Sequence, residues 1–344
     1  MDAFATHGVK LMGTSHRQAP IKNLVKRVQE GLMDLYHNPE GYEIVIGDGG
    51  STAFWDVASF SLAEGKAQAL VHGEFGGKFA NALKAPWLTA PTVINGTPGS
   101  RLELQAEAGV SLYAYAQNET STGVVTPVKR LAGLDEGALF LTDATSAAGG
   151  IDFDPTETDV YYFAPQKNFA SDGGLWFALM SPAAVERAER VATSGRYIPE
   201  FLSLKTAIDN SRLNQTLNTP AIATLFLLAE QIDWINGNGG LAWADARTKS
   251  ASQHMYDWAE ASSFATPYVA NPEHRSQVVA TIDFDDAIDA AQIAKVLRAN
   301  GIVDTEPYRK LGRNQLRIAT FTAVDLEDVQ QLTKSIDFVV SQLS

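Results

Sequence analysis

Polar side chains follow three apolar segments of the sequence, and their chemical types can act together. Thr120 comes shortly after residues 110–117, Asp143 after residues 137–142, and Lys167 after residues 158–165. Each segment is short and rich in β-branched or aromatic residues, which is typical of a strand buried on both faces. Because ligands of open α/β sheets bind outside the carboxyl ends of the strands, we expect these side chains to share one crevice.

A lysine, a carboxylate and an anion-binding turn together suit pyridoxal phosphate. Lys167 offers an amine for a Schiff base with the cofactor aldehyde, and Asp143 offers a carboxylate that keeps the pyridine nitrogen protonated. The turn GDGGST, residues 47–52, lies between a predicted strand at 42–47 and a helix from residue 53. Its glycines allow close backbone approach, and amides at a helix start favour a phosphate group.

Each of these features also has a simpler interpretation when it is taken alone. Lys167 would then be a solvated loop residue, Asp143 a helix cap or an Asx-turn, and GDGGST an ordinary turn. Only their joint placement after successive strands favours the cofactor site.

Strand and helix patterns alternate through the first two-thirds of the chain. This order predicts an α/β fold, with a mostly parallel mixed sheet flanked by helices. A long helix is expected at residues 219–235, with Pro220 in its first turn, and a second at 241–262. Two further strand–helix pairs follow, at 276–301 and 314–343. We therefore predict a large domain at residues 1–245 and a smaller C-terminal α/β domain at 246–344.

The composition excludes several classes of function. The formal net charge of −13 disfavours broad binding to nucleic acid or to anionic membranes, so an anionic ligand needs a local basic pocket. The 344 residues include no cysteine, which excludes disulfides, thiolate metal sites and cysteine nucleophiles. We predict no bound metal. The sequence shows neither a membrane-spanning run nor a signal-peptide pattern, so we expect a soluble cytoplasmic protein.

Several longer motifs resemble the phosphoserine aminotransferases, in particular their actinobacterial-type branch. This family belongs to the fold-type I, class V enzymes that use pyridoxal phosphate. The resemblance covers nearly the whole chain. The matching motifs are GTSHRQAP, GDGGSTAFWD, QNETSTGV, DATSAAGG, APQKNFASDGGLW, NQTLNTPAIATL and EPYRKLGRNQLR. Relatives usually carry an upstream segment with a Gly-Pro turn, whereas here Met1 lies close before Gly13.

The resemblance implies a role for individual residues around the cofactor. Lys167 would be the Schiff-base lysine and the base that moves the Cα proton, and Asp143 would pair with the pyridine nitrogen. Phe75 would stack on the ring where many relatives have tryptophan. The remaining cofactor contacts would come from Gly50, Ser51, Thr52, Thr120 and Gln166, and from Asn218 and Thr219 of the partner subunit in a homodimer.

The resemblance also implies cationic groups for the substrate. Arg317 would hold the α-carboxylate through a bidentate contact. His16 and Arg17 would bind the distal phosphate or the γ-carboxylate. Arg309 and Arg313 lie in the same basic segment, residues 308–317, but do not align unambiguously with the family's phosphate ligands. For each basic residue in this segment, a solvated loop position is the alternative.

The implied reaction converts 3-phosphohydroxypyruvate and L-glutamate into O-phospho-L-serine and 2-oxoglutarate, in serine biosynthesis. A second role in pyridoxine biosynthesis stays open. The alternatives are an alanine–glyoxylate or serine–pyruvate aminotransferase and a non-catalytic binding relative. An aminotransferase for small uncharged substrates would not need His16, Arg17 and the basic segment together. The presence of Lys167 and Asp143 disfavours a non-catalytic relative. A cysteine desulfurase is excluded, because that reaction needs a cysteine nucleophile.

Overall fold

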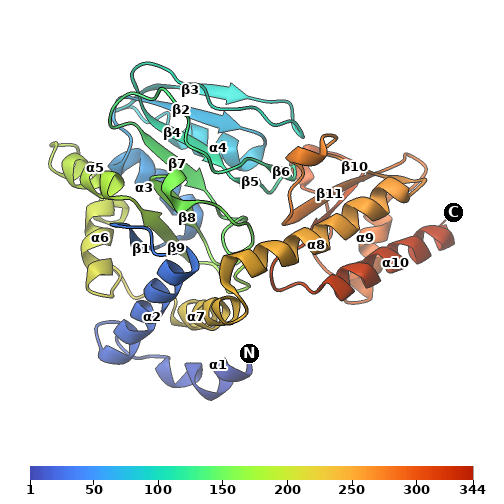
Figure 1. The fold of residues 1–344 in the computed structure, drawn as a ribbon. Coiled ribbons are helices and arrows are strands. Elements are labelled where there is room, and N and C mark those ends of the chain that lie inside the picture. Colours follow the sequence, from blue (N-terminus) through green and yellow to red (C-terminus); the bar gives the residue numbers. More distant parts are fainter. Residues whose placement is uncertain (344) are drawn as a thin grey trace.

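The chain folds around one large sheet and one smaller sheet, which a long helix connects (Figure 1). The computed structural model describes residues 1–343. Within that range the large sheet has seven strands in the order β1-β9-β8-β7-β4-β2-β3. Its strands are β1 (Glu43–Asp48), β2 (Lys66–Val71), β3 (Thr89–Asn95), β4 (Val110–Ala116), β7 (Leu139–Asp143), β8 (Val160–Phe163) and β9 (Leu175–Met180).

The large sheet is mixed but mostly parallel, as the sequence predicts. β2 pairs with β3 and β4 in parallel, and the parallel ladder continues through β7 to β8. Only β9 runs against its neighbours, β8 and β1. β4, β7 and β8 therefore all end at the same edge of the sheet, which is the edge that the sequence assigns to the crevice.

Helices cover both faces of this sheet, because alternate strand residues point to opposite sides. Tyr161 and Phe163 of β8 enter the core shared with helices α2 (Ala19–Leu35) and α7 (Ile222–Gly237). Tyr162 enters the core on the opposite face. That face is covered by α3 (Gly50–Ser61), α4 (Glu74–Ala82), α5 (Pro182–Ala192) and α6 (Leu204–Arg212). The sheet is thus the middle layer of three.

The C-terminal part has its own antiparallel sheet and its own core. The order is β10-β11-β12, with α9 and α10 packed beside α8 (Figure 1). The bounds are α8 (Gly240–Ala261), β10 (Ala265–Pro267), β11 (Val279–Phe284), α9 (Ala290–Ala299), β12 (Gln315–Ala319) and α10 (Leu326–Leu343). The predicted boundary between residues 245 and 246 lies inside α8, and the division into two domains stays a prediction.

A short N-terminal helix, a small hairpin and several 3-10 helices complete the fold. The N-terminal α1 (Asp2–Thr6) packs near α7, and the small hairpin of β5 (Asn118–Glu119) and β6 (Val124–Val125) follows β4. Short 3-10 helices are η1 (Gly8–Leu11), η2 (Pro155–Glu157), η3 (Glu200–Leu202), η4 (Pro272–His274) and η5 (Arg309–Leu311). α7 begins at Ile222, so Pro220 precedes the helix instead of lying in its first turn.

None of the helices within residues 1–343 is both long and apolar enough to cross a membrane.

Candidate active site

A cavity of about 300 Å³ lies at the carboxyl edge of the large sheet. The ends of β4, β7 and β8 contribute to its wall, as does the start of α3. Eight of the residues predicted from the sequence line it: Gly50, Ser51, Thr52, Phe75, Thr120, Asp143, Gln166 and Lys167. The structure therefore brings the predicted lysine, carboxylate and glycine turn into one enclosed space.

Lys167 is a largely buried cation that lies beside a second one. Burial lowers the pKa of its ammonium group, and the neighbouring Arg317 guanidinium lowers that pKa further. Within the described chain, Nζ forms neither a hydrogen bond nor an ion pair with another side chain. Both effects increase the share of neutral amine, which is the form that reacts with a carbonyl carbon or accepts a proton.

Asp143 is buried, and donors surround both of its carboxylate oxygens. Oδ1 accepts hydrogen bonds from the backbone nitrogen of Thr145 at 2.9 Å and from Thr145 Oγ1 at 2.6 Å. Oδ2 accepts from the hydroxyl of Tyr162 at 2.7 Å and from Trp55 Nε1 at 3.2 Å. These contacts hold the carboxylate in place, and a carboxylate can pair with a cationic ring nitrogen.

The glycine turn supplies the start of α3. Gly49 and Gly50 have φ angles of 103° and 69°, which only glycine adopts readily. This conformation turns the chain directly from β1 into the helix, so the first amides of α3 lack helical partners and face the cavity opening. Ser51 Oγ lies 2.7 Å from Thr145 Oγ1. The turn and the Asp143 loop are therefore linked by one hydroxyl contact.

A buried polar cluster lies on the opposite wall of the cavity. Ser146 Oγ accepts from Thr120 Oγ1 and from Asn118 Nδ2, each at 2.8 Å. Asn118 Oδ1 is buried and has no hydrogen-bond partner in the described protein. The Ser146 hydroxyl therefore joins Thr120 and Asn118 in one hydrogen-bonded cluster.

Phe75 forms the wall at the start of α4. The carboxylate of the buried Glu119 accepts from the backbone nitrogens of Phe75 at 3.3 Å and Gly76 at 2.9 Å. Burial raises the pKa of Glu119, and these amide donors oppose that rise. The carboxylate thus caps α4 and fixes the backbone that carries the phenylalanine ring.

Arg317 lies on β12 of the smaller sheet, near Lys167, but it is not among the residues that line the 300 Å³ cavity. Its Nη1 donates to the carbonyl of Thr120 at 3.2 Å, and its guanidinium lies 5.6 Å from the centre of the Tyr308 ring. Burial lowers the pKa of Arg317, although the group keeps its charge near neutral pH. Arg309 is exposed on η5, and Arg313 instead forms an ion pair with Asp283 at 2.5 Å.

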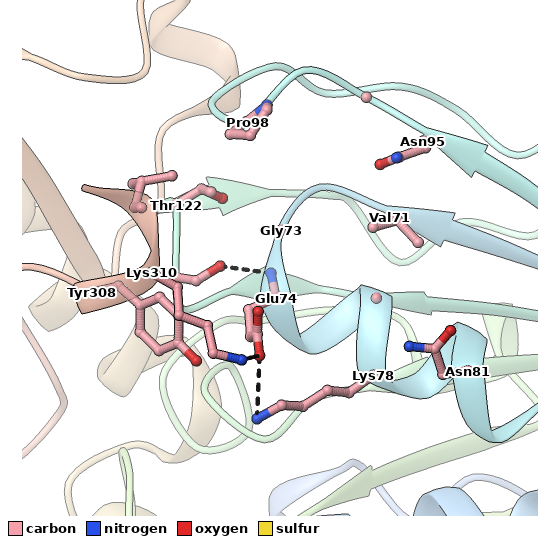
Figure 2. Close-up of a pocket in the computed structure, with 14 residues that line it drawn as sticks. Val71, Gly73, Glu74, Lys78, Asn81, Asn95, Pro98, Thr122, Tyr308 and Lys310 are labelled. Carbon is pink, nitrogen blue, oxygen red and sulfur yellow. Dashed lines mark hydrogen bonds and ion pairs between the residues drawn. The ribbon is translucent and has the colours of Figure 1, made fainter. Parts of the chain in front are cut away.

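The loop that carries Tyr308 also contacts the start of α4. Figure 2 shows Glu74 between Lys310 and Lys78, in a neighbouring cavity of about 540 Å³. Glu74 forms ion pairs with both lysines, the one to Lys78 at 3.6 Å. The Tyr308 ring lies 5.8 Å from that of Phe75. The C-terminal part is thereby joined to the wall of the first cavity.

The four remaining predicted residues form a separate cluster. His16 Nδ1 lies 3.1 Å from Thr219 Oγ1, and Arg17 donates to Gln215 Oε1 at 2.6 Å. The Asn218 backbone donates to the carboxylate of Asp48, next to the glycine turn. Burial and the Arg17 charge lower the pKa of His16, so its ring is neutral near pH 7. None of His16, Arg17, Asn218 and Thr219 lines the 300 Å³ cavity.

Some cavity residues were not among the predicted contacts. Trp55, Asn118, Thr145 and Ser146 all line it. Asn118, Thr145 and Ser146 follow the same strands as Thr120 and Asp143, so their position after β4 and β7 was the available signal. The sequence does not indicate that Trp55 lines the cavity, because it lies in an apolar helix where a tryptophan is expected to be an ordinary core residue.

The fold and the site together indicate the protein family to which the chain belongs. A family model described as Aminotransferase class-V matches residues 4–305, and the chain belongs to this family. Among curated proteins, the phosphoserine aminotransferase of a Nocardioides species is 61% identical over 345 residues, covering 100% of this chain and 92% of the relative. The phosphoserine aminotransferase of Rhodococcus opacus is 60% identical over 337 residues, covering 98% and 90% respectively. These relatives confirm the resemblance seen in the sequence.

Solved structures with the same fold are more distant in sequence. A phosphoserine aminotransferase from Cytophaga hutchinsonii superposes with a TM-score of 0.88 at 21% identity, covering 98% of this chain and 95% of the other. The enzyme from Bacillus circulans subsp. alkalophilus gives 0.84 at 21% identity, covering 97% and 90%. At such low identity these matches show the fold alone, and they confirm the predicted fold type I architecture.

The carboxyl of Asp48 gives a prediction that concerns stability and pH. Burial raises its pKa to about 6, while the Asn218 amide opposes the rise. In the unfolded chain the carboxyl ionises near pH 4. Burying the Asp48 carboxylate therefore does not lower the free energy of unfolding below about pH 4, and lowers it by the full amount above about pH 6. Asp48→Asn should stabilise the ligand-free protein by about 2 kcal/mol at pH 8 and change little at pH 4.

Urea unfolding at both pH values measures this difference. Asp56→Asn, at an exposed position of the following helix α3, is the control and should change stability by less than about 0.5 kcal/mol. An equal effect of Asp48→Asn at the two pH values would contradict the assignment of a titrating buried carboxyl.

Proposed function

We propose that this chain is a pyridoxal phosphate-dependent phosphoserine aminotransferase of serine biosynthesis. It transfers the amino group of L-glutamate to 3-phosphohydroxypyruvate and releases O-phospho-L-serine and 2-oxoglutarate. The observation that carries the proposal is the joint placement of Lys167, Asp143 and the start of α3 in one cavity. The curated relatives at about 60% identity carry this activity in their names.

The residues of the cavity fit the cofactor. The amides of Gly50 and Ser51 at the start of α3 suit its phosphate, and Thr52 adds a hydroxyl donor. Asp143 offers an acceptor to the ring nitrogen, and Phe75 offers an aromatic face. The hydroxyl of Thr120 offers a polar partner on the cavity wall. Lys167 would hold the aldehyde, and Gln166 would support the phosphate.

The chemistry divides between cofactor and protein. When bound, pyridoxal phosphate supplies an electron-accepting ring that stabilises the charge left after the substrate Cα–H bond breaks. The amine of Lys167, whose pKa is lowered by burial and by Arg317, would accept that proton and move it from the substrate Cα to the former aldehyde carbon of the cofactor. Arg317, held by the carbonyl of Thr120, binds the α-carboxylate and orients the Cα–H bond. Glutamate binds these residues in the first half-reaction, and the keto acid binds them in the second.

The second anionic group of the substrate requires a further cation. Glutamate carries a γ-carboxylate and O-phosphoserine a phosphate, and His16 and Arg17 bind either group. Arg17 is tied to Gln215, and its guanidinium stays available for a bidentate contact with an oxyanion. Arg309 is an exposed cation that can join this pocket, whereas the ion pair with Asp283 occupies Arg313. Small uncharged substrates would leave these charges without partners.

The active form is a homodimer with shared sites. His16 and Arg17 are attached to the segment 215–219, which lies outside the cavity of its own chain. The chain also exposes large apolar side chains, among them Met12 (50%), Phe201 (47%) and Leu213 (59%). Such a surface favours a protein partner. Two-fold symmetry would then bring Arg17 and Thr219 of one chain to the cavity of the other. We also assign the reaction to the cytoplasm.

Replacing Arg17 tests the substrate assignment. Arg17→Ala should raise KM for 3-phosphohydroxypyruvate, because one charged contact to the phosphate is lost, at a cost of about 2–4 kcal/mol. Cofactor affinity should change little. Steady-state kinetics and cofactor titration measure the two effects separately. Arg212→Ala, which removes an exposed arginine paired with Glu43, is the control. It should leave both KM and cofactor affinity near the wild-type values. Weakened cofactor retention with an unchanged KM would show that Arg17 does not bind substrate.

Mixing two impaired variants, assayed at a substrate concentration far below the KM of Arg17→Ala, tests the shared sites. Lys167→Ala removes the amine, and Arg17→Ala removes the distal cation, so each homodimer has two damaged sites. A co-expressed mixture should recover about one quarter of the wild-type activity, because half of the dimers are hybrids with one intact site. Separately purified variants, assayed without exchange of subunits, are the control. No recovery in verified hybrid dimers would mean that each chain supplies both residues to its own site.

A further inference from the structure

Two aromatic side chains donate to the same oxygen of Asp143. The Tyr162 hydroxyl lies 2.7 Å from Oδ2, and Trp55 Nε1 lies 3.2 Å from it. Trp55 Nε1 also lies 2.9 Å from the Tyr162 oxygen. The tyrosine hydroxyl thus accepts from the indole and donates to the carboxylate. All three side chains are buried.

The fold fixes this contact from two directions. Tyr162 of β8 is the register partner of Asp143 on β7, so the two residues are neighbours across a parallel ladder. Trp55 lies one turn after Ser51 on α3, so the helix that offers its amides to the phosphate also supplies the indole donor. Phe54 stacks on the Tyr162 ring at 4.3 Å between centres. The tyrosine therefore has little freedom to turn its hydroxyl away.

These donors compensate for the hydration that a buried carboxylate loses. A carboxylate taken out of water becomes protonated unless hydrogen bonds or a cation stabilise its charge. Tyr162 remains a donor at any working pH, because burial and the Asp143 charge raise its pKa well above the ordinary value. Thr145 donates only to Oδ1, so without the aromatic pair Oδ2 would have no donor among residues 1–343.

We propose that Tyr162 and Trp55 are positioning residues that hold the Asp143 carboxylate in hydrogen bonds and aim it at the ring nitrogen of pyridoxal phosphate. This inference rests on the proposed function, because only the bound cofactor supplies that nitrogen. The pair acts through Asp143 and sets how firmly the proton stays on the ring. A role in packing alone would change stability without changing the protonation of the ring.

The test uses pyridoxal phosphate that carries an NMR-active isotope at the ring nitrogen. In the wild-type holoenzyme, without substrate, the nitrogen signal should lie in the protonated range. Tyr162→Phe keeps the ring and its stacking on Phe54 but removes the donor, so the signal should move toward the neutral range. The dissociation constant of the cofactor should also rise by about tenfold to a hundredfold, the range expected for losing a hydrogen bond to a charged group.

Tyr161→Phe is the matched control. Tyr161 is the preceding residue of β8, is equally buried, and donates to Gln117 Oε1 at 2.8 Å on the other face of the sheet. Its loss should lower stability and leave the ring-nitrogen signal and the cofactor affinity unchanged. Trp55→Phe removes the second donor independently and should shift the signal in the same direction as Tyr162→Phe, which keeps the test valid if one variant fails to fold.

The outcomes separate this inference from the proposed function. A wild-type signal that remains unchanged in Tyr162→Phe and Trp55→Phe would overturn the positioning role while leaving the cofactor assignment intact. Equal shifts in Tyr161→Phe and Tyr162→Phe would also overturn it, since the effect would then come from general packing. Failure of the wild-type protein to bind the labelled cofactor would instead overturn the proposed function itself.

Discussion

The parallel pairing of β4, β7 and β8 is the constraint on which the site depends. In a parallel ladder all strands end at the same edge, so residues that are distant in sequence become neighbours there. Asp143 ends β7, and Lys167 follows β8 by a short turn. A slip of one residue in either strand would turn the buried aromatic side chains to the wrong face. The hydrophobic cores on both faces of the sheet thus fix the strand register, and this register places Asp143 and Lys167 at the same edge.

Burial then sets the reactivity of the groups at that edge. Lys167 and Arg317 are two cations in a largely buried position, and mutual repulsion together with burial lowers the pKa of the lysine. Asp143 is buried as well, but hydrogen-bond donors on both oxygens compensate for its lost hydration. The protein therefore places an amine of lowered pKa and a fully hydrogen-bonded carboxylate in the same cavity. This is the separation of acid–base roles by environment that proton transfer requires.

The sequence predicts the local elements of the site better than its long-range contacts. Lys167 and Asp143 could be predicted, because each follows a short apolar strand. Tyr162 could not be distinguished from Tyr161, since alternation shows two buried positions but not which face carries the carboxylate. The contact of His16 with Thr219 joins residues from distant parts of the chain, and no local pattern encodes it. The same limit applies to Arg313, whose partner Asp283 lies across the β11–β12 pair.

The most direct test of the account is an absorption titration of the purified, cofactor-loaded protein. O-phosphoserine, serine and alanine are added separately, and conversion of the cofactor to its amino form is followed by the loss of its visible band. The account predicts that O-phosphoserine drives the conversion, and that serine and alanine do so far less effectively. Equal conversion by alanine or serine would contradict the phosphate pocket formed by His16 and Arg17, and a protein with no such band would contradict the role of Lys167.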